Sequence, residues 1–295
     1  MHPSKNATLL RALISEADSL ASRASRNEFP ILLRPIAERR KVTSVDFCPL
    51  LVDAMLTTHP AGFRILLNSD GGRAQELTDR YLNESKLRML LPRLRFSIAH
   101  ELAHTFFYDL TKTTPTLSKT FTSGGGRTEL ENLERHCNTI ASHLLLPTQM
   151  FKAGFLRLKI ITPESIANFA RTAGVSLQTF LLRLDRCDSL FINKPFRGCV
   201  VLVDQRENEL KIRAIAKPRS FNIAYQLLQM QPNKYWKLKA HDTSEIIPST
   251  LMNNSTVVLD IETNRSKTQK EYEIRVAELG GFDMSNSYLI TFEEK

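Results

Sequence analysis

The feature that most constrains this sequence is a pair of amphipathic helical segments in its first half. From Arg93 onward apolar residues recur at helical spacing, and these are Phe96, Ile98, Ala99, Leu102, Ala103 and Phe106. A second helical segment extends from about Thr128 to Leu146 and stops before Pro147, where a helix must end or kink. Together with the strand-like segments on either side, these two helices predict an α+β fold.

The segments before these helices predict a helix followed by a small sheet. Apolar residues at helical spacing predict a helix over about residues 6–26. After Pro30 the pattern becomes strand-like, with one strand from Phe47 to Met55 and another from Phe63 to Leu67. A turn over residues 59–62 separates them, so two or three strands of a small sheet are expected.

The segments after these helices predict two further parts of the chain. Residues 163–186 have the pattern of two short helices around Gly174. Beyond residue 195 the pattern is mainly that of strands, with one helix expected near Phe221 to Met230. We therefore expect a first domain over 1–160, a helix-turn-helix-like segment over 161–195 and a C-terminal α/β domain over 196–295. In this last part Trp236 and His241 are expected to serve the fold.

The composition is that of an ordinary globular protein. Of the 295 residues 42% are hydrophobic and 24% are charged, which excludes wholesale disorder. No apolar run reaches about 18 residues, so no membrane span is expected, and the first residues do not form an apolar signal segment. The four cysteines are scattered without a Cys-x-x-Cys pair, which predicts reduced thiols and a cytoplasmic location.

The pentapeptide His100-Glu101-Leu102-Ala103-His104 lies in the first helical segment. On an α-helix residues i and i+4 share a face, so both imidazoles can reach one metal ion, and Glu101 can hydrogen-bond a water molecule held there. Zinc is the expected ion, because imidazole nitrogen suits it and a catalytic site keeps one position open. The alternative is a helix with two partly exposed histidines and no metal.

A carboxylate on the second helical segment is the candidate third ligand. The apolar stripe of this segment consists of Leu130, Leu133, Cys137, Ile140, Ala141, Leu144 and Leu145. Glu134 lies inside the stripe, where a carboxylate is unfavourable unless it is paired or bound to a cation. His100, His104 and Glu134 would then be the three protein ligands of a catalytic zinc. A salt bridge from Glu134 to an arginine is the alternative.

The two helical segments resemble the paired motifs of the ImmA/IrrE-type metallopeptidases. The first is RFSIAHELAH over residues 95–104, and the second is ERHCNTIASHLLLP over residues 134–147. Cys137 stands where the family usually has alanine, Ile140 where it has phenylalanine, and His136 where an acid often lies. None of these departures removes an expected ligand, although His136 leaves room for a different third one.

The resemblance implies a zincin-like core, a small sheet with the active-site helices, and a zinc-dependent endopeptidase. Such enzymes are often regulatory and cut a helix-turn-helix repressor, which induces stress or mobile-element genes. Glu101 would take a proton from the attacking water and pass it to the leaving amine. Candidates for stabilising the negative charge on the carbonyl oxygen are Tyr108, His136 and His143, by proximity in sequence.

Two other functions remain open: a DNA-binding regulator with a structural zinc, and a protein that binds a partner without cutting it. A net charge of +9 is compatible with nucleic acid, but the excess is concentrated in residues 1–195 and nearly absent beyond. The second helix of the helix-turn-helix-like segment is mostly apolar where a DNA reader would present polar side chains. We therefore favour a packing or substrate-docking role for this segment.

Overall fold

The computed structural model describes residues 5–26, 28–69, 92–112, 115–117, 127–158, 160–187, 190, 198–206, 209–216, 235–236, 255–263, 266–278 and 287–294. The chain is a mixed α+β protein with two compact units. The first unit comprises residues 1–151 and 171–176, and the second comprises 152–170 and 177–295. The three-part division expected from the sequence stays a prediction.

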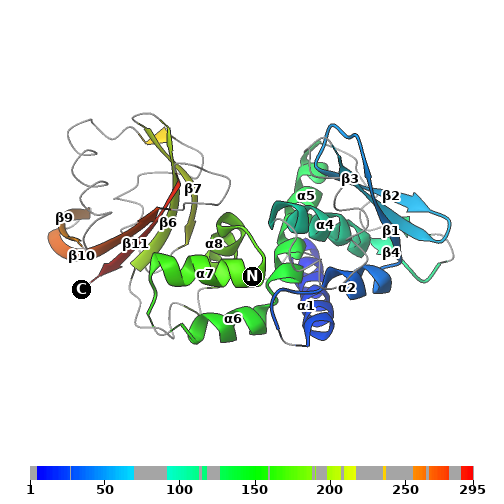
Figure 1. Ribbon diagram of the computed structural model, residues 1–295, viewed down its shortest axis with the longest axis horizontal. Helices are drawn as coiled ribbons and strands as arrows, with labels where there is room; N and C mark the ends of the chain where they lie inside the picture. Colours follow the sequence, from blue (N-terminus) through cyan, green and yellow to red (C-terminus); the bar gives the residue numbers. More distant parts are fainter. Residues whose placement is uncertain are drawn as a thin grey trace. The chain divides into compact units, whose positions relative to one another are not determined.

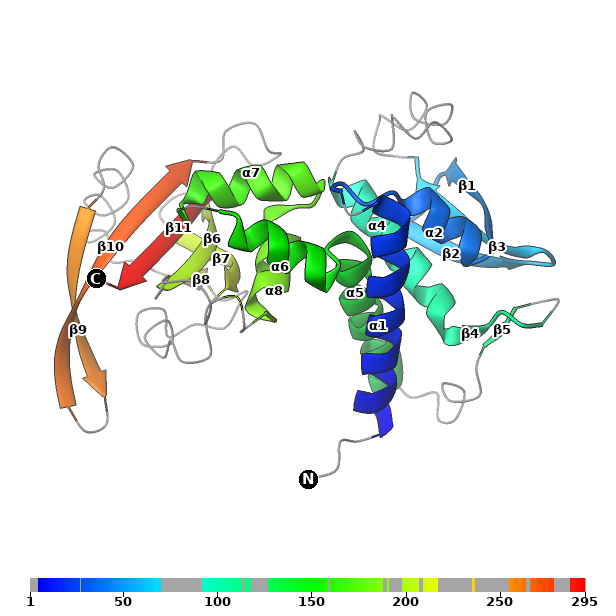
Figure 2. The same cartoon turned by 90° about the horizontal axis from the view of Figure 1, so that it is seen from below.

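The first unit contains a sheet of three strands, β1 (Val42–Cys48), β2 (Ala54–His59) and β3 (Gly62–Asn68). Their order is β1-β3-β2, with β1 parallel and β2 antiparallel to β3, so β2 is an edge strand of this sheet (Figures 1 and 2). The expected single strand from Phe47 to Met55 is wrong. Pro49 follows the end of β1, and a proline cannot donate a ladder hydrogen bond, so the chain leaves the sheet before β2 begins.

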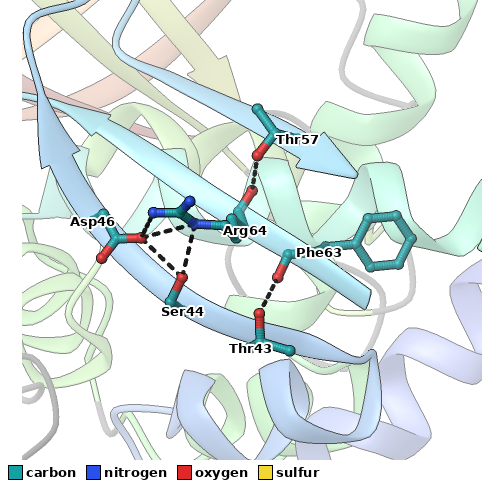
Figure 3. A network of polar contacts seen from close by, with 6 residues as sticks. All are labelled: Thr43, Ser44, Asp46, Thr57, Phe63 and Arg64. Atoms are coloured by element: carbon teal, nitrogen blue, oxygen red, sulfur yellow. Dashed lines mark hydrogen bonds and ion pairs between the residues drawn. The ribbon is translucent and has the colours of Figure 1, made fainter. Parts of the chain in front are cut away.

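The two faces of this sheet differ because side chains of a strand alternate between them. On β3 the side chains of Phe63, Ile65 and Leu67 are fully buried, whereas Arg64 is exposed. Figure 3 shows the Arg64 guanidinium reaching across to β1, where Nη2 lies 2.9 Å from Oδ2 of Asp46 and Nε lies 3.3 Å from Oγ of Ser44. The buried face therefore belongs to the core, and the other face is polar.

Helices pack against the buried face of the sheet. α4 (Pro92–His104) contacts β2, β3 and α5 (Arg127–Leu145), and α5 in turn contacts α1 (Lys5–Ser25) (Figure 2). The helices expected over 6–26, from Arg93 and over 128–146 are thus confirmed. α2 (Leu33–Arg39) was not expected, because it includes a proline and its seven residues are fewer than the window over which helical periodicity is recognised.

The C-terminal end of α4 continues into a short 3₁₀ helix, η2 (Thr105–Phe107). The next residues form a two-stranded ribbon of β4 (Tyr108–Asp109) and β5 (Thr116–Leu117). Arg40 anchors the segment between α4 and β4. Its Nη2 donates to the carbonyl oxygen of Thr105 at 2.6 Å, and its Nε donates to the hydroxyl of the same residue at 3.1 Å.

The second unit is built on an antiparallel sheet of order β8-β7-β6-β11-β10-β9. Its strands are β6 (Gly198–Arg206), β7 (Glu209–Ala216), β8 (Tyr235–Trp236), β9 (Ser255–Thr263), β10 (Ser266–Glu278) and β11 (Ser287–Glu294). The helices in this region are α6 (Thr148–Leu156), α7 (Pro163–Ala173) and α8 (Leu177–Asp185), of which α8 packs against β7 and β6. The two short helices around Gly174 and the β-type runs beyond residue 195 are therefore confirmed.

Three further expectations concern segments that the structure does not describe, the cysteines and membrane-spanning helices. The helix near Phe221 to Met230 and the role of His241 lie outside the described residues. All four cysteines are free thiols. Within the described ranges, no helix has the length and apolar character needed to cross a membrane.

Candidate metal centre

Three polar side chains from α4 and α5 converge in the first unit. His100 and His104 are one helical turn apart on α4, so their rings lie on the same face, and their Nε2 atoms are 3.2 Å apart. Glu134 of α5 lies opposite, with Oε2 at 3.0 Å from Nε2 of His100 and Oε1 at 3.6 Å from Nε2 of His104. Packing of α4 against α5 therefore brings together the three residues expected as metal ligands.

The other ring nitrogen of each histidine is held by α5. Nδ1 of His100 lies 3.0 Å from Oδ1 of Asn138, and Nδ1 of His104 lies 3.4 Å from Sγ of Cys137. A proton on Nδ1 satisfies both contacts and leaves both Nε2 lone pairs directed at the same point. These contacts were not expected from the sequence, although Asn138 lies one helical turn after Glu134 and therefore shares its face.

The donor set fits a zinc ion. Two ligands at 2.0–2.1 Å from a tetrahedral zinc lie about 3.4 Å from each other. The two Nε2 atoms are 3.2 Å apart, and they lie 3.0 Å (His100) and 3.6 Å (His104) from the Glu134 oxygens. Burial and the neighbouring His100 lower the pKa of His104, which favours the neutral imidazole that binds a metal. The salt bridge from Glu134 to an arginine is not formed among the described residues, where the partners of Glu134 are histidines.

Glu101 lies beside this group and is mostly buried, at 7% exposure. One ligand-type atom from each of His100, Glu101 and His104 lies within 4.8 Å of the others. Burial raises the pKa of the Glu101 carboxyl, and this effect outweighs the attraction to His100 and the hydrogen bond from the backbone N–H of Leu56. A carboxylate with a raised pKa accepts a proton more readily than an ordinary one, as a general base must.

The four side chains open into one cleft of about 570 Å³. Its described lining comprises Val52, Asp53, Ala54, Met55, Leu56, Phe96, Ser97, His100, Glu101, His104, Tyr108 and Glu134. The cleft therefore extends from the two site helices to the edge strand β2. Val52 and Met55 are exposed apolar side chains on this wall.

The three candidates for charge stabilisation have different positions. Tyr108 lines the cleft, whereas the described lining does not include His136 or His143. Nδ1 of His143 is 2.9 Å from Oδ1 of Asp18, so this imidazole is engaged with α1. The structure therefore brings Tyr108 to the site and leaves the two histidines away from it.

Residues 82–185 match the family described as IrrE N-terminal-like domain, Peptidase_M78. Among the curated proteins compared with this sequence, none matches. A solved structure described as a Mycobacterium tuberculosis transcriptional regulator aligns with a TM-score of 0.46 and 13% sequence identity. That alignment covers 96% of this chain and 76% of the other.

Proposed function

We propose that the protein, whose residues 82–185 match the IrrE N-terminal-like domain family, is a zinc-dependent endopeptidase with a zincin-like core. His100, His104 and Glu134 hold the metal, and Glu101 is the catalytic acid–base. The observation that carries the proposal is the convergence of two Nε2 atoms and a carboxylate within 3.0–3.6 Å of one another in an open cleft. A structural zinc site would be closed by a fourth protein ligand.

Zinc bound there would act as a Lewis acid toward the peptide carbonyl and make a nearby water molecule more acidic. Glu101 accepts a proton from the attacking water as its oxygen joins the carbonyl carbon. The same carboxyl then delivers a proton to the amine nitrogen as the carbon–nitrogen bond breaks. Burial of Glu101, which raises its pKa, supports the first half of this exchange, in which the carboxylate takes up the proton.

The edge strand β2 supports a peptide as the substrate. Ala54, Met55 and Leu56 lie on the cleft wall, and β2 has a sheet neighbour on one side alone among the described strands. An extended peptide can hydrogen-bond to such an open edge while its side chains contact the wall. In agreement with the family resemblance, we propose a protein substrate such as a helix-turn-helix repressor, a role in stress-linked transcription regulation and a cytoplasmic location.

The second helix of the helix-turn-helix-like segment is unsuited to DNA reading. On α8, the buried residues are Leu177, Phe180, Leu181, Arg183 and Leu184. α8 packs against β7 of its own unit, so much of its surface is unavailable to a DNA groove. This arrangement supports a packing role and weighs against direct DNA binding.

The decisive experiment compares the wild type with Glu101→Gln. The variant should retain about one zinc per chain by elemental analysis, because Glu101 is not a ligand. Its cleavage rate should fall by about 10²- to 10⁴-fold, because the proton acceptor is lost. The assay mixes the protein with helix-turn-helix repressors encoded near its gene and detects fragments by mass spectrometry.

Glu131→Gln is the matched control, since Glu131 lies on the exposed side of α5. It loses the same charge and should cleave at the wild-type rate. A wild-type protein that binds zinc but cuts no repressor would favour partner binding without cleavage. A wild-type protein that binds no zinc would overturn the proposed site.

A further inference from the structure

We propose that Tyr108 is a catalytic residue whose phenolic hydroxyl donates a hydrogen bond to the scissile carbonyl oxygen as negative charge develops on it. This inference rests on the proposed peptidase function and assigns a further residue to the same site. It separates the three candidates that sequence proximity left equivalent.

Tyr108 is placed at the cleft by the chain that follows α4. Four residues after His104, and directly after η2, it begins β4 and lines the cleft together with Glu101 and His104. The buried Arg40 anchors the segment between α4 and β4 by donating hydrogen bonds to the carbonyl oxygen and the hydroxyl of Thr105. The position of Tyr108 relative to His104 is therefore set by a short segment of chain with a buried anchor.

The ring of Tyr108 is fixed by packing against the sheet. Its centroid lies 5.0 Å from that of Phe63, with the rings at 77° in an edge-to-face arrangement. Phe63 is fully buried on β3 and provides a rigid support. A ring held in this way loses little freedom when its hydroxyl binds, and a preorganised donor is the kind that stabilises a transition state.

The other polar side chains on the described cleft wall cannot take this role. Apart from the four site residues, they are Asp53, Ser97 and Tyr108. Asp53 is a carboxylate paired with Arg93 at 2.8 Å, and the hydroxyl of Ser97 donates to the carbonyl oxygen of Arg93 at 3.1 Å. The Tyr108 hydroxyl has no hydrogen-bond partner among the residues that the structure describes.

The charges around the cleft make a neutral donor useful. Glu101 has taken up the proton of the water when negative charge develops on the carbonyl oxygen, so the Glu134 carboxylate is the group that repels this charge. A phenol donates a hydrogen bond without needing a proton on either site histidine. One such donor contributes about 10²- to 10³-fold to turnover in other enzymes.

Tyr108→Phe tests the inference, because it removes the oxygen and keeps the ring on Phe63. The probe is a library of internally quenched peptides, from which one substrate cut by the wild type is selected. The expected result is a fall in kcat of about 10²- to 10³-fold with KM changed less than about threefold. Zinc content by elemental analysis should equal that of the wild type.

Binding of an N-phosphoryl dipeptide gives a readout independent of turnover. Its tetrahedral phosphoryl oxygens imitate the charged carbonyl oxygen, so Tyr108→Phe should weaken its binding by at least about tenfold in calorimetry. Tyr288→Phe, which removes a hydroxyl from β11 in the second unit, is the matched control and should change neither turnover nor this affinity.

The outcomes distinguish this inference from the proposed function. If the wild type cleaves and Tyr108→Phe cleaves within threefold of it, the role of Tyr108 is overturned and the peptidase function stands. If Tyr108→Phe loses its zinc, Tyr108 is structural and the inference also fails. A wild type that cleaves nothing overturns both.

Discussion

The two site histidines differ in the groups that support them. His100 is held by the amide oxygen of Asn138, a strong acceptor, whereas His104 is held by the thiol of Cys137, a weak one. Burial raises the pKa of the Cys137 thiol, and the carboxylates of Glu134 and Glu101 add to the effect, so this sulfur stays protonated. The hydrogen bond to Asn138 therefore orients the His100 imidazole more firmly than the contact with Cys137 orients the His104 imidazole.

This difference predicts unequal effects of removing the two supports. Asn138→Ala should lower zinc affinity by about 10- to 100-fold, the usual cost of losing such a partner. Cys137→Ala should lower it by less than about tenfold, because the lost hydrogen bond is weak. Competition with a chromophoric zinc chelator measures both affinities. Equal losses in the two variants would contradict the assigned asymmetry.

At the scale of elements, α4 is held by a buried arginine at its N-terminal half. Arg95 is 1% exposed, and its guanidinium donates to the carbonyl oxygens of Ile31 and Gly174 at 2.8 and 3.0 Å. Gly174 has φ +64°, and a Cβ added there would lie 3.0 Å from Nε of Arg95 and 3.2 Å from Cβ of Pro30. Glycine thus permits both the turn and the approach of Arg95.

Gly174→Ala should therefore destabilise the protein by about 1–3 kcal/mol, from left-handed backbone strain and the close contact with Arg95. Urea denaturation followed by circular dichroism measures this loss. Arg26→Gly is the contrasting variant, because Arg26 has φ +51° after α1. Arg26→Gly should change the free energy of unfolding by less than about 0.5 kcal/mol. Glycine relieves the backbone strain in the folded state, but it also gives the unfolded chain more conformational freedom, and the two effects offset each other. An unchanged urea midpoint for Gly174→Ala would mean that neither the backbone conformation at this position nor the contact with Arg95 requires glycine.

The sequence predicted those elements whose pattern is local. Helical periodicity predicted α1, α4 and α5, and i,i+4 spacing predicted that His100 and His104 share a face. Glu134 was found because a charge inside an apolar stripe needs a partner. The contact of Leu56 with Glu101 and the approach of Tyr108 to Phe63 depend on strand order, which joins segments that are distant in the sequence. No local pattern specifies that order.

At the largest scale, the first unit depends on polar contacts between segments far apart in the chain. Arg40 joins Glu16 of α1 to Thr105 after α4, with Nη1 at 2.9 Å from Oε1 of Glu16. Asp18 of α1 accepts hydrogen bonds from the backbone N–H of Thr148, at 3.0 Å, and from His143 of α5. An anion at the N-terminal end of α6 is favourable, because unpaired N–H groups point toward it. These contacts couple α1 to the helices around the metal centre.

The contact at Asp18 predicts an acid-dependent part of the stability. Burial raises the pKa of Asp18, but the hydrogen bonds from His143 and Thr148 outweigh it and hold that pKa below its ordinary value. A carboxyl group with a lowered folded-state pKa stabilises the fold fully above its unfolded pKa of about 3.9. That contribution is lost as the pH falls through the folded-state pKa.

Asp18→Asn should therefore lower the melting temperature relative to the wild type at pH 6. The difference should shrink as the pH falls below about 4, where the wild-type carboxyl also becomes neutral. Scanning calorimetry of both proteins between pH 3 and pH 6 measures it. Glu28→Gln is the matched control, because the Glu28 side chain is exposed and its carboxylate has no hydrogen bond or ion pair among the described residues, so it should change the melting temperature little at either pH. A difference at Asp18 that stays constant down to pH 3 would mean that the ionised carboxylate does not join α1 to α5 and α6.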